Sequence, residues 1–161
     1  MSKTATSDAD STLAERRLPV LLRRAWFGLN QCFRRRIAAS SLTPGQYTAL
    51  RTLSEQGDIS QRELTAIMSS DPNTIASLVS RMEKLGWLRR ESHELDRRAN
   101  RLHLTSAGKR KLQRIRPLAM ELQGRILNVV SKNEQAAFLK NLALVADACQ
   151  AENADEEDEA E

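Results

Sequence analysis

Two groups of polar side chains in this 161-residue sequence have the chemistry to bind nucleic acid. The first group follows a Pro at helical spacing and consists of Asn73, Thr74, Ser77, Ser80 and Arg81. Amide, hydroxyl and guanidinium groups hydrogen-bond base edges, and small side chains let a helix enter a major groove. The second group surrounds one carboxylate with guanidinium groups and consists of Asp96, Arg97, Arg98 and Arg101. Guanidinium groups suit phosphates and narrow minor grooves, although solvated surface charges would look the same.

The charge of the chain also favours a polyanionic partner. The formal net charge of +4 includes the segment 152–161, which holds seven acids and no base. The preceding residues hold 25 basic and 14 acidic residues, a net charge of +11, and arginine outnumbers lysine 19 to 6. The planar guanidinium makes forked contacts that the lysine ammonium cannot make. The alternatives are a basic protein whose charge only aids solubility, and an acidic segment that either competes with DNA or only solubilises the chain.

Capping signals place the first polar group on the second of two closely spaced helices. Ser60 and Glu63 have the spacing of a capping box, and Asp71 is an N-cap residue followed by Pro72 at the first helical position. The few residues between the two helices suit a helix-turn-helix. The sequence predicts a third helix over about 61–69 and a fourth that ends at Gly86, with a buried face of Ile75, Leu78, Val79, Met82 and Leu85.

The second polar group falls in a predicted β-hairpin. The segments "WLRRES" and "RLHLT" have strand character, and "HELDRRAN" between them reads as a long charged loop. Amphipathic helices are expected on either side of this region. They cover about Ala14 to Ala39, Pro44 to Gln56, a long fifth helix after Thr105, and a sixth that reaches Cys149. A short strand is expected between the second and third helices.

The order of elements resembles that of the MarR family of bacterial winged helix-turn-helix transcription regulators. The resemblance rests on "DPNTIASLVSRMEKLGWLRR" and "LDRRANRLHLTSAGK", and it covers about Ala14 to Ala148. The wing motif of the family, Asp-x-Arg followed by Leu-Thr-x-x-Gly, is matched by Asp96, Arg98, Leu104, Thr105 and Gly108. The implied fold is mainly α with a small β-wing: a winged helix-turn-helix inserted between N- and C-terminal dimerisation helices.

Composition at the two ends and the resemblance between them predict five segments. These are a disordered N-terminus (1–11), an N-terminal dimerisation helix (12–42), a winged helix-turn-helix DNA-binding domain (43–105), C-terminal dimerisation helices (106–150) and an acidic disordered tail (151–161).

The implied function is that of a homodimeric, sequence-specific regulator of transcription, a repressor that binds double-stranded DNA at a pseudo-palindromic operator. The fourth helix would read the major groove, and Arg98, held by Asp96, would enter the minor groove. A small anionic aromatic effector, such as an aromatic acid or an aryl-coenzyme A thioester, would release the operator. Its candidate site consists of Trp26, Asn30, Phe33, Arg34, Arg36 and Tyr47. The alternative for these residues is that the aromatic rings are core and the arginines face solvent.

Two other modes of action stay open: a redox response through Cys32, whose neighbouring arginines would favour a thiolate, and nonspecific, architectural DNA binding. The two cysteines, Cys32 and Cys149, have no metal or disulfide spacing. We therefore expect no metal and no cofactor. We find no nucleophile with a base, no phosphate loop and no paired carboxylates, so an enzyme is not predicted. The absence of a signal peptide and of a long apolar run predicts a cytoplasmic protein without a membrane partner.

Overall fold

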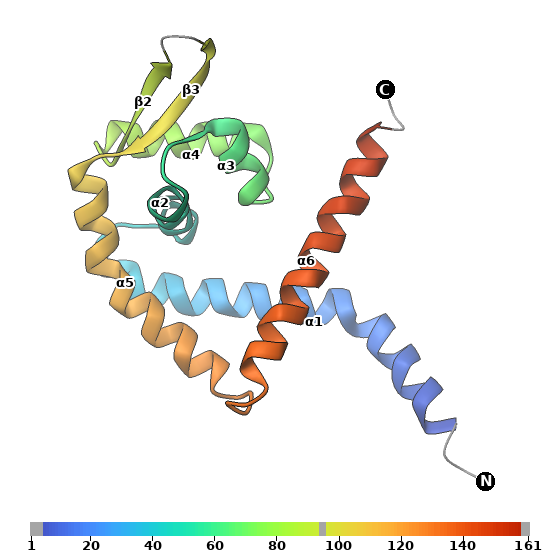
Figure 1. The fold of residues 1–161 in the computed structure, drawn as a ribbon. Helices are drawn as coiled ribbons and strands as arrows, with labels where there is room; N and C mark the ends of the chain where they lie inside the picture. The colour runs from blue at the N-terminus through green and yellow to red at the C-terminus, as the bar shows by residue number, and fades with distance from the viewer. Residues whose placement is uncertain (1–4, 94–95, 159–161) are drawn as a thin grey trace. The chain divides into compact units, whose positions relative to one another are not determined.

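The computed structural model describes the backbone of residues 5–93 and 96–158 and the side chains of residues 17–91 and 101–152. The chain divides into two compact units, residues 1–44 and 45–161, which are considered in turn (Figure 1). Within the described ranges, no helix combines the length and the apolar content that a membrane span requires.

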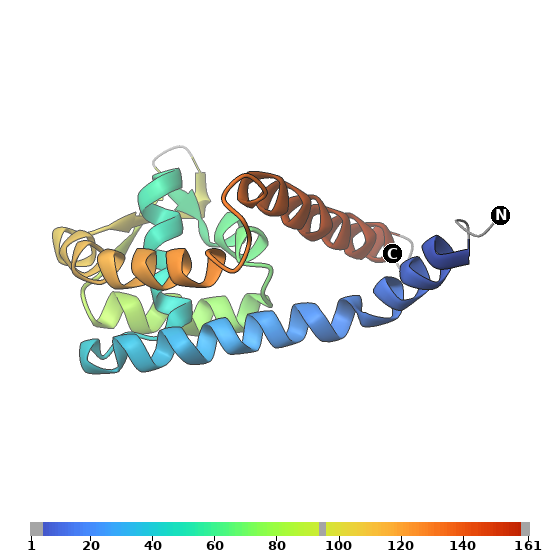
Figure 2. The same cartoon turned by 90° about the horizontal axis from the view of Figure 1, so that it is seen from below.

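The first unit is dominated by one long helix, α1 (Ala5–Ile37), followed by a single 3-10 turn, η1 (Ala38–Ser40). The helix begins nine residues before its predicted start at Ala14 and thus includes most of the segment for which the sequence predicts disorder. Pro19 lies inside α1, where it removes one backbone hydrogen bond. The helix changes direction in its deeper-blue N-terminal part (Figures 1 and 2), as an internal proline causes.

The apolar stripe predicted for this helix is buried only near its C-terminal end. Phe33 and Ile37 are buried, whereas Leu18 and Leu29 remain 44% and 41% exposed. An apolar stripe that stays exposed on a helix is typical of a surface that packs against another apolar surface.

The second unit contains the helix-turn-helix and its sheet. It begins with α2 (Pro44–Gln56), then β1 (Ile59–Ser60), α3 (Gln61–Ile67) and α4 (Pro72–Lys84). The predicted caps are confirmed. The Ser60 hydroxyl accepts from the backbone N–H of Glu63 at 3.1 Å while the Glu63 carboxylate accepts from the Ser60 N–H at 2.6 Å, and the Asp71 carboxylate accepts from the Thr74 N–H at 2.8 Å.

Both helices of this motif end in the same type of turn. After α4, the N–H groups of Gly86 and Trp87 donate to the carbonyls of Glu83 and Met82, with Gly86 at φ 70° as the sequence predicts. After α3, the N–H groups of Ser69 and Ser70 donate to Ala66 and Thr65 in the same pattern. Ser69 lies at φ 45°, a left-handed conformation that costs a residue other than glycine about 1 kcal/mol.

The sheet has three antiparallel strands in the order β1, β3, β2. β2 (Leu88–His93) and β3 (Asp96–Leu104) form the hairpin, and β3 also pairs with β1 through Ile59 and Leu102. The predicted long loop 93–100 is wrong, because the backbone of residues 96–100 belongs to β3. In this part of the strand Asn100 pairs with Ser92 and Asp96 with His93. Such cross-strand pairs satisfy backbone groups, and the polar sequence alone does not reveal them. The register shifts between Ser92 and His93.

The core of this unit joins the sheet to the helix-turn-helix. Leu88 and Leu102 on the strands are buried together with the predicted apolar face of α4, apart from Leu85, which is 52% exposed. Leu50 of α2 and Leu64 of α3 are fully buried as well. Each such side chain contributes roughly 1.5–3 kcal/mol.

Two helices complete the unit: α5 (Ser106–Leu127) and α6 (Gln135–Asp158). Leu112, Ile115, Ala119 and Leu122 of the predicted α5 stripe are buried, whereas Ile126 is 42% exposed. The backbone of α6 stays helical beyond the predicted boundary at residue 150, into a segment rich in Ala and Glu, which are strong helix formers.

Candidate nucleic-acid interface

The solvent face of α4 carries the first polar group identified in the sequence. Asn73, Thr74, Ser77 and Arg81 are exposed, and Ser80 is half-buried. The opposite face of the helix is buried, and the two capping interactions fix where α3 and α4 begin. The helix therefore presents amide, hydroxyl and guanidinium groups from a rigid support, as base recognition in a major groove requires.

The capping hydrogen bonds also lower the pKa values of the two capping carboxyl groups, Asp71 and Glu63. Hydrogen bonds from Thr74 hold the pKa of the Asp71 carboxyl below its usual range, and hydrogen bonds from Ser60 do the same for Glu63. Both carboxylates therefore stay ionised at neutral pH and stabilise the positive N-terminal ends of α4 and α3.

The wing places the second polar group in β3. The backbone positions of Asp96, Arg97 and Arg98 lie in that strand, but their side chains lie outside the described residues. The contact of Arg98 with DNA and its support by Asp96 thus stay predictions.

Two arginines near the wing have partners within the protein that sequence reasoning missed. The Arg90 guanidinium donates to the Glu83 carboxylate on α4 at 2.7 Å and to the Gln61 side chain on α3 at 3.3 Å. The Arg101 guanidinium donates to the Asp58 carbonyl at 2.6 Å. Arg90 therefore ties β2 to both helices of the motif. Arg101, exposed and predicted to contact DNA, also ties β3 to the residue before β1.

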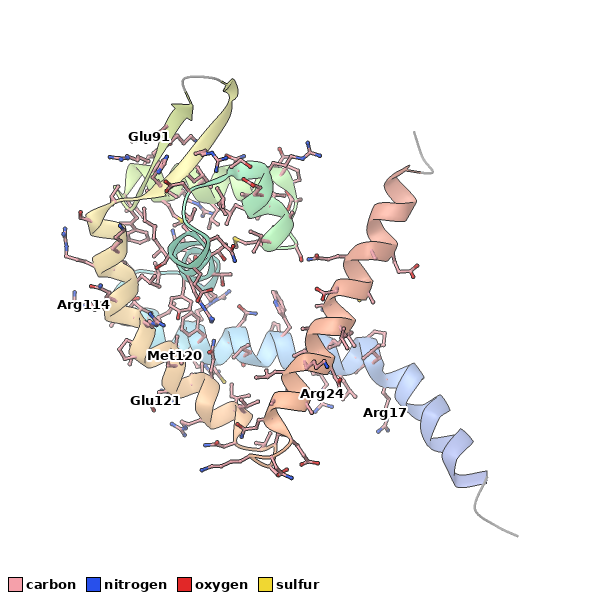
Figure 3. All side chains as sticks on the ribbon, in the orientation of Figure 1. Arg17, Arg24, Glu91, Arg114, Met120 and Glu121 are labelled. Carbon is pink, nitrogen blue, oxygen red and sulfur yellow. The ribbon has the colours of Figure 1, made fainter. Side chains whose placement is uncertain are left out.

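His103 links the three strands at the base of the wing. Its Nδ1 lies 2.6 Å from Asp58 Oδ1 and its Nε2 lies 3.3 Å from Glu91 Oε2. Glu91, labelled in Figure 3, also pairs with Arg89 at 2.7 Å. The carboxylates come from the turn before β1 and from β2, so this cluster braces the hairpin through polar contacts.

The Leu-Thr-x-x-Gly part of the wing motif forms a tight junction between β3, the end of α4 and α5. The Thr105 hydroxyl donates to the Gly86 carbonyl at 2.6 Å and accepts from the Gly108 N–H at 3.1 Å. The Thr105 N–H donates to the Trp87 carbonyl at 3.1 Å. A β-carbon at position 108 would lie 2.0 Å from that carbonyl oxygen, so only glycine fits. The Lys111 ammonium completes the junction 5.1 Å from the centre of the Trp87 ring.

The predicted effector residues divide between the two units. On α1, Trp26 is 67% exposed, Phe33 is buried, Arg34 is exposed, and Asn30 and Arg36 are half-buried. The Asn30 amide donates to the Trp26 carbonyl at 2.9 Å. Trp26, Asn30 and Phe33 follow helical spacing along one side of α1. Trp26 is therefore not a core residue within one chain.

Tyr47, the remaining effector candidate, is buried on α2. Burial raises the pKa of its phenol above the ordinary value, while the positive charges of Arg51 and Arg116 act in the opposite direction. The phenol is therefore neutral at physiological pH.

Cys32 and Cys149 are both free and exposed. Among the residues whose side chains are described, no group of three or more His, Cys, Asp or Glu side chains could hold a metal ion.

Comparison with known proteins agrees with this geometry. The sequence model of the MarR family matches residues 42–99. YsmB of Bacillus subtilis, an uncharacterised HTH-type transcriptional regulator, is 31% identical over 102 residues, which are 63% of this chain and 70% of YsmB. The chain belongs to the MarR family. The transcriptional regulator HosA of Escherichia coli O127:H6 is 29% identical over 125 residues, which are 74% of this chain and 93% of HosA.

Solved structures show the same MarR fold. BpsR of Bordetella bronchiseptica, described with the regulation of its DNA binding by 6-hydroxynicotinic acid, matches with a TM-score of 0.74 and 25% identity, over 80% of this chain and 92% of that chain. MarR of Escherichia coli without ligand matches with a TM-score of 0.68 and 19% identity, over 80% and 96% of the two chains. The protein is thus a DNA-binding transcriptional regulator of a non-enzymatic family whose members bind DNA, typically as dimers.

Proposed function

We propose that this MarR-family protein is a homodimeric repressor that binds a specific pseudo-palindromic operator and leaves it when a small anionic aromatic molecule binds. The observation that carries the proposal is the polar, exposed face of α4 over a buried apolar face, joined by the Thr105–Gly108 junction to the wing. In a dimer the two α4 helices would enter major grooves about one helical turn apart, roughly 10 base pairs, or a multiple of that.

Sequence specificity is tested by the salt dependence of binding. Affinity for the DNA upstream of the protein's own gene is measured against a mixed-sequence duplex over a series of salt concentrations. We expect specific binding to exceed nonspecific binding by about 10³-fold or more, because base contacts add to phosphate contacts. Equal affinities at every salt concentration would instead identify a nonspecific, architectural DNA-binding protein.

The proposed effector class rests on the side chains of the candidate residues and on the ligand named for one similar protein. The α1 candidates combine an indole ring with guanidinium groups, which suit an aromatic anion. The effector named for BpsR, 6-hydroxynicotinic acid, is an aromatic carboxylate. Both observations favour an aromatic acid, free or as a thioester, over a neutral or cationic ligand.

Release by an effector is tested with a panel of aromatic acids, including 6-hydroxynicotinic acid, titrated into the protein–operator complex. We expect Trp26→Ala and Arg36→Gln to raise the concentration that releases half of the DNA by about tenfold or more, since each loses one contact. Arg35→Gln removes the same charge from the adjacent, exposed position and serves as the matched control. Release at unchanged concentration from both variants would contradict the proposed site.

A further inference from the structure

One exposed basic surface takes no part in the interface described so far. The first three turns of α5 carry five basic residues and no acid. Lys109, Arg110 and Arg114 are exposed and lie outside the buried stripe, Lys109 on its flank and the two arginines on the opposite side. We call these three residues the α5 basic face. Figure 3 shows Arg114 on the side of α5 turned away from α2.

The α5 basic face is not neutralised by the described part of the chain. Among the described side chains, no carboxylate forms an ion pair with any of its three residues, and the Arg125–Glu121 pair lies near the other end of this helix. Lys111, their neighbour, contacts the Trp87 ring. Three cations thus face solvent together.

The placement of these cations is unfavourable for the helix itself. Lys109 lies in the first turn of α5, where the positive end of the helix dipole repels a cation, and that turn contains no acid. Arg110 and Arg114 are four residues apart, so their like charges repel each other along the helix. Both unfavourable terms become favourable when a polyanion lies against this face.

The α5 basic face is rigidly continuous with the DNA-binding elements. Thr105 and Gly108 bind α5 to Gly86 and Trp87, the residues that end α4. Exposed cations also lie on α4, at Arg81 and Lys84, and on β2, where Arg89 pairs with Glu91. The basic face therefore moves as one body with the recognition helix and the base of the wing.

We propose that the α5 basic face binds the phosphate backbone of double-stranded DNA beside the segment read by the wing, extending the interface along α5. This inference rests on the proposed function, since the DNA must already be held by α4 and the wing. The three side chains would contribute affinity and salt dependence without base selectivity, as phosphate contacts do.

The test compares the full-length protein with the triple variant Lys109→Gln/Arg110→Gln/Arg114→Gln on a mixed-sequence DNA duplex over a series of salt concentrations. Each lost phosphate contact lowers the slope of log affinity against log salt by about 0.9, so we expect a decrease of roughly 2 to 3. The control is Arg125→Gln/Lys132→Gln/Lys140→Gln, which removes the same charge from exposed positions outside the α5 basic face. We expect its slope to equal that of the wild type.

The outcomes separate this inference from the proposed function. Wild-type protein that binds no DNA would overturn both. Equal slopes for wild type and triple variant, or equal decreases in the triple variant and the control, would overturn the role of α5 alone. The triple variant should unfold at the same temperature as the wild type or higher, because repulsion is removed. If it unfolds lower, the single variants Arg110→Gln and Arg114→Gln decide, each with an expected decrease of about 0.9.

Discussion

Individual residues at the base of the wing determine how the DNA-reading elements are held. Gly108 admits the Trp87 carbonyl where any side chain would collide, and Arg90 ties β2 to α3 and α4. These residues are positioning residues, because their partners are protein groups. The sequence motif that contains Gly108 thus has a packing reason as well as a family resemblance.

Replacing the glycine at this junction tests the packing. We expect Gly108→Ala to lower the free energy of unfolding by about 1–3 kcal/mol, because backbone must shift to admit the β-carbon. Gly124→Ala is the control in the same helix, where a β-carbon meets nothing within 4 Å, and it should raise stability by roughly 0.5–1 kcal/mol. Urea denaturation measures both, and equal midpoints for the two variants would show that the junction does not have this geometry.

Arg90 and Arg89 provide a second pair of matched variants. Arg90→Gln should lower the free energy of unfolding by about 1 kcal/mol, a modest value because the Arg90 and Glu83 side chains are 29% and 38% exposed. Arg89→Gln, at a side chain that is 63% exposed, should change it by no more than about 0.5 kcal/mol. Thermal or urea unfolding distinguishes the two. A larger effect at Arg89 would reverse the roles assigned to these arginines.

At the scale of elements, capping residues close in sequence determine where the helices begin, whereas contacts between residues distant in sequence determine the structure of the wing. Ser60, Asp71 and Thr105 could be predicted as caps because each acts on an N–H three residues away. Gln61, one partner of Arg90, and Asp58, the partner of Arg101, lie 29 and 43 residues away in sequence, so no local pattern revealed them. The length of β3 was missed for the same reason, since strand pairing overrides a polar sequence.

The caps of α3 and α4 also predict how the motif responds to acid. The pKa values of Glu63 and Asp71 are lowered in the folded protein by hydrogen bonds from Ser60 and Thr74. A lowered folded pKa gives stability that is present above the unfolded pKa, about 4, and is lost as pH falls below it through the folded pKa.

We therefore expect unfolding free energy to fall as pH drops below about 4, and Asp71→Asn to reduce this dependence, because an amide oxygen caps without titrating. Ser60→Ala should cost about 1 kcal/mol at neutral pH. Urea denaturation between neutral pH and pH of about 3 measures both effects. If the Asp71→Asn protein kept the wild-type pH dependence, the Asp71 cap would not be a source of the acid sensitivity.

Across the whole molecule, the exposed apolar side chains indicate what a single chain lacks. Along α6 the large apolar residues remain 40–58% exposed: Phe138, Leu139, Leu142 and Leu144. On α1, Trp26 and Phe27 are 67% and 60% exposed. Sequence periodicity predicted these helices, but their apolar side chains stay exposed in a single chain. Exposed apolar area on this scale favours a second copy as the partner.

Dimerisation is tested by Leu142→Lys. Sedimentation should show wild-type protein at the mass of two chains, and Leu142→Lys should shift it toward one chain and abolish operator binding, because a charge enters an apolar contact. Asn141→Lys adds the same charge at the exposed neighbouring position and should remain dimeric. A monomeric wild type that still binds the operator would refute the dimer.

The glycine at the base of the wing also constrains how this protein can evolve. Every coding substitution of Gly108 adds a β-carbon, and the Trp87 carbonyl already occupies that space. A substitution at position 108 therefore requires a shift of the Trp87 backbone. Because the Trp87 N–H donates to the Met82 carbonyl, that shift would also displace the end of α4. We therefore expect new DNA specificities to arise by exchange of side chains on the exposed face of α4, and not by changes at the Gly108 junction.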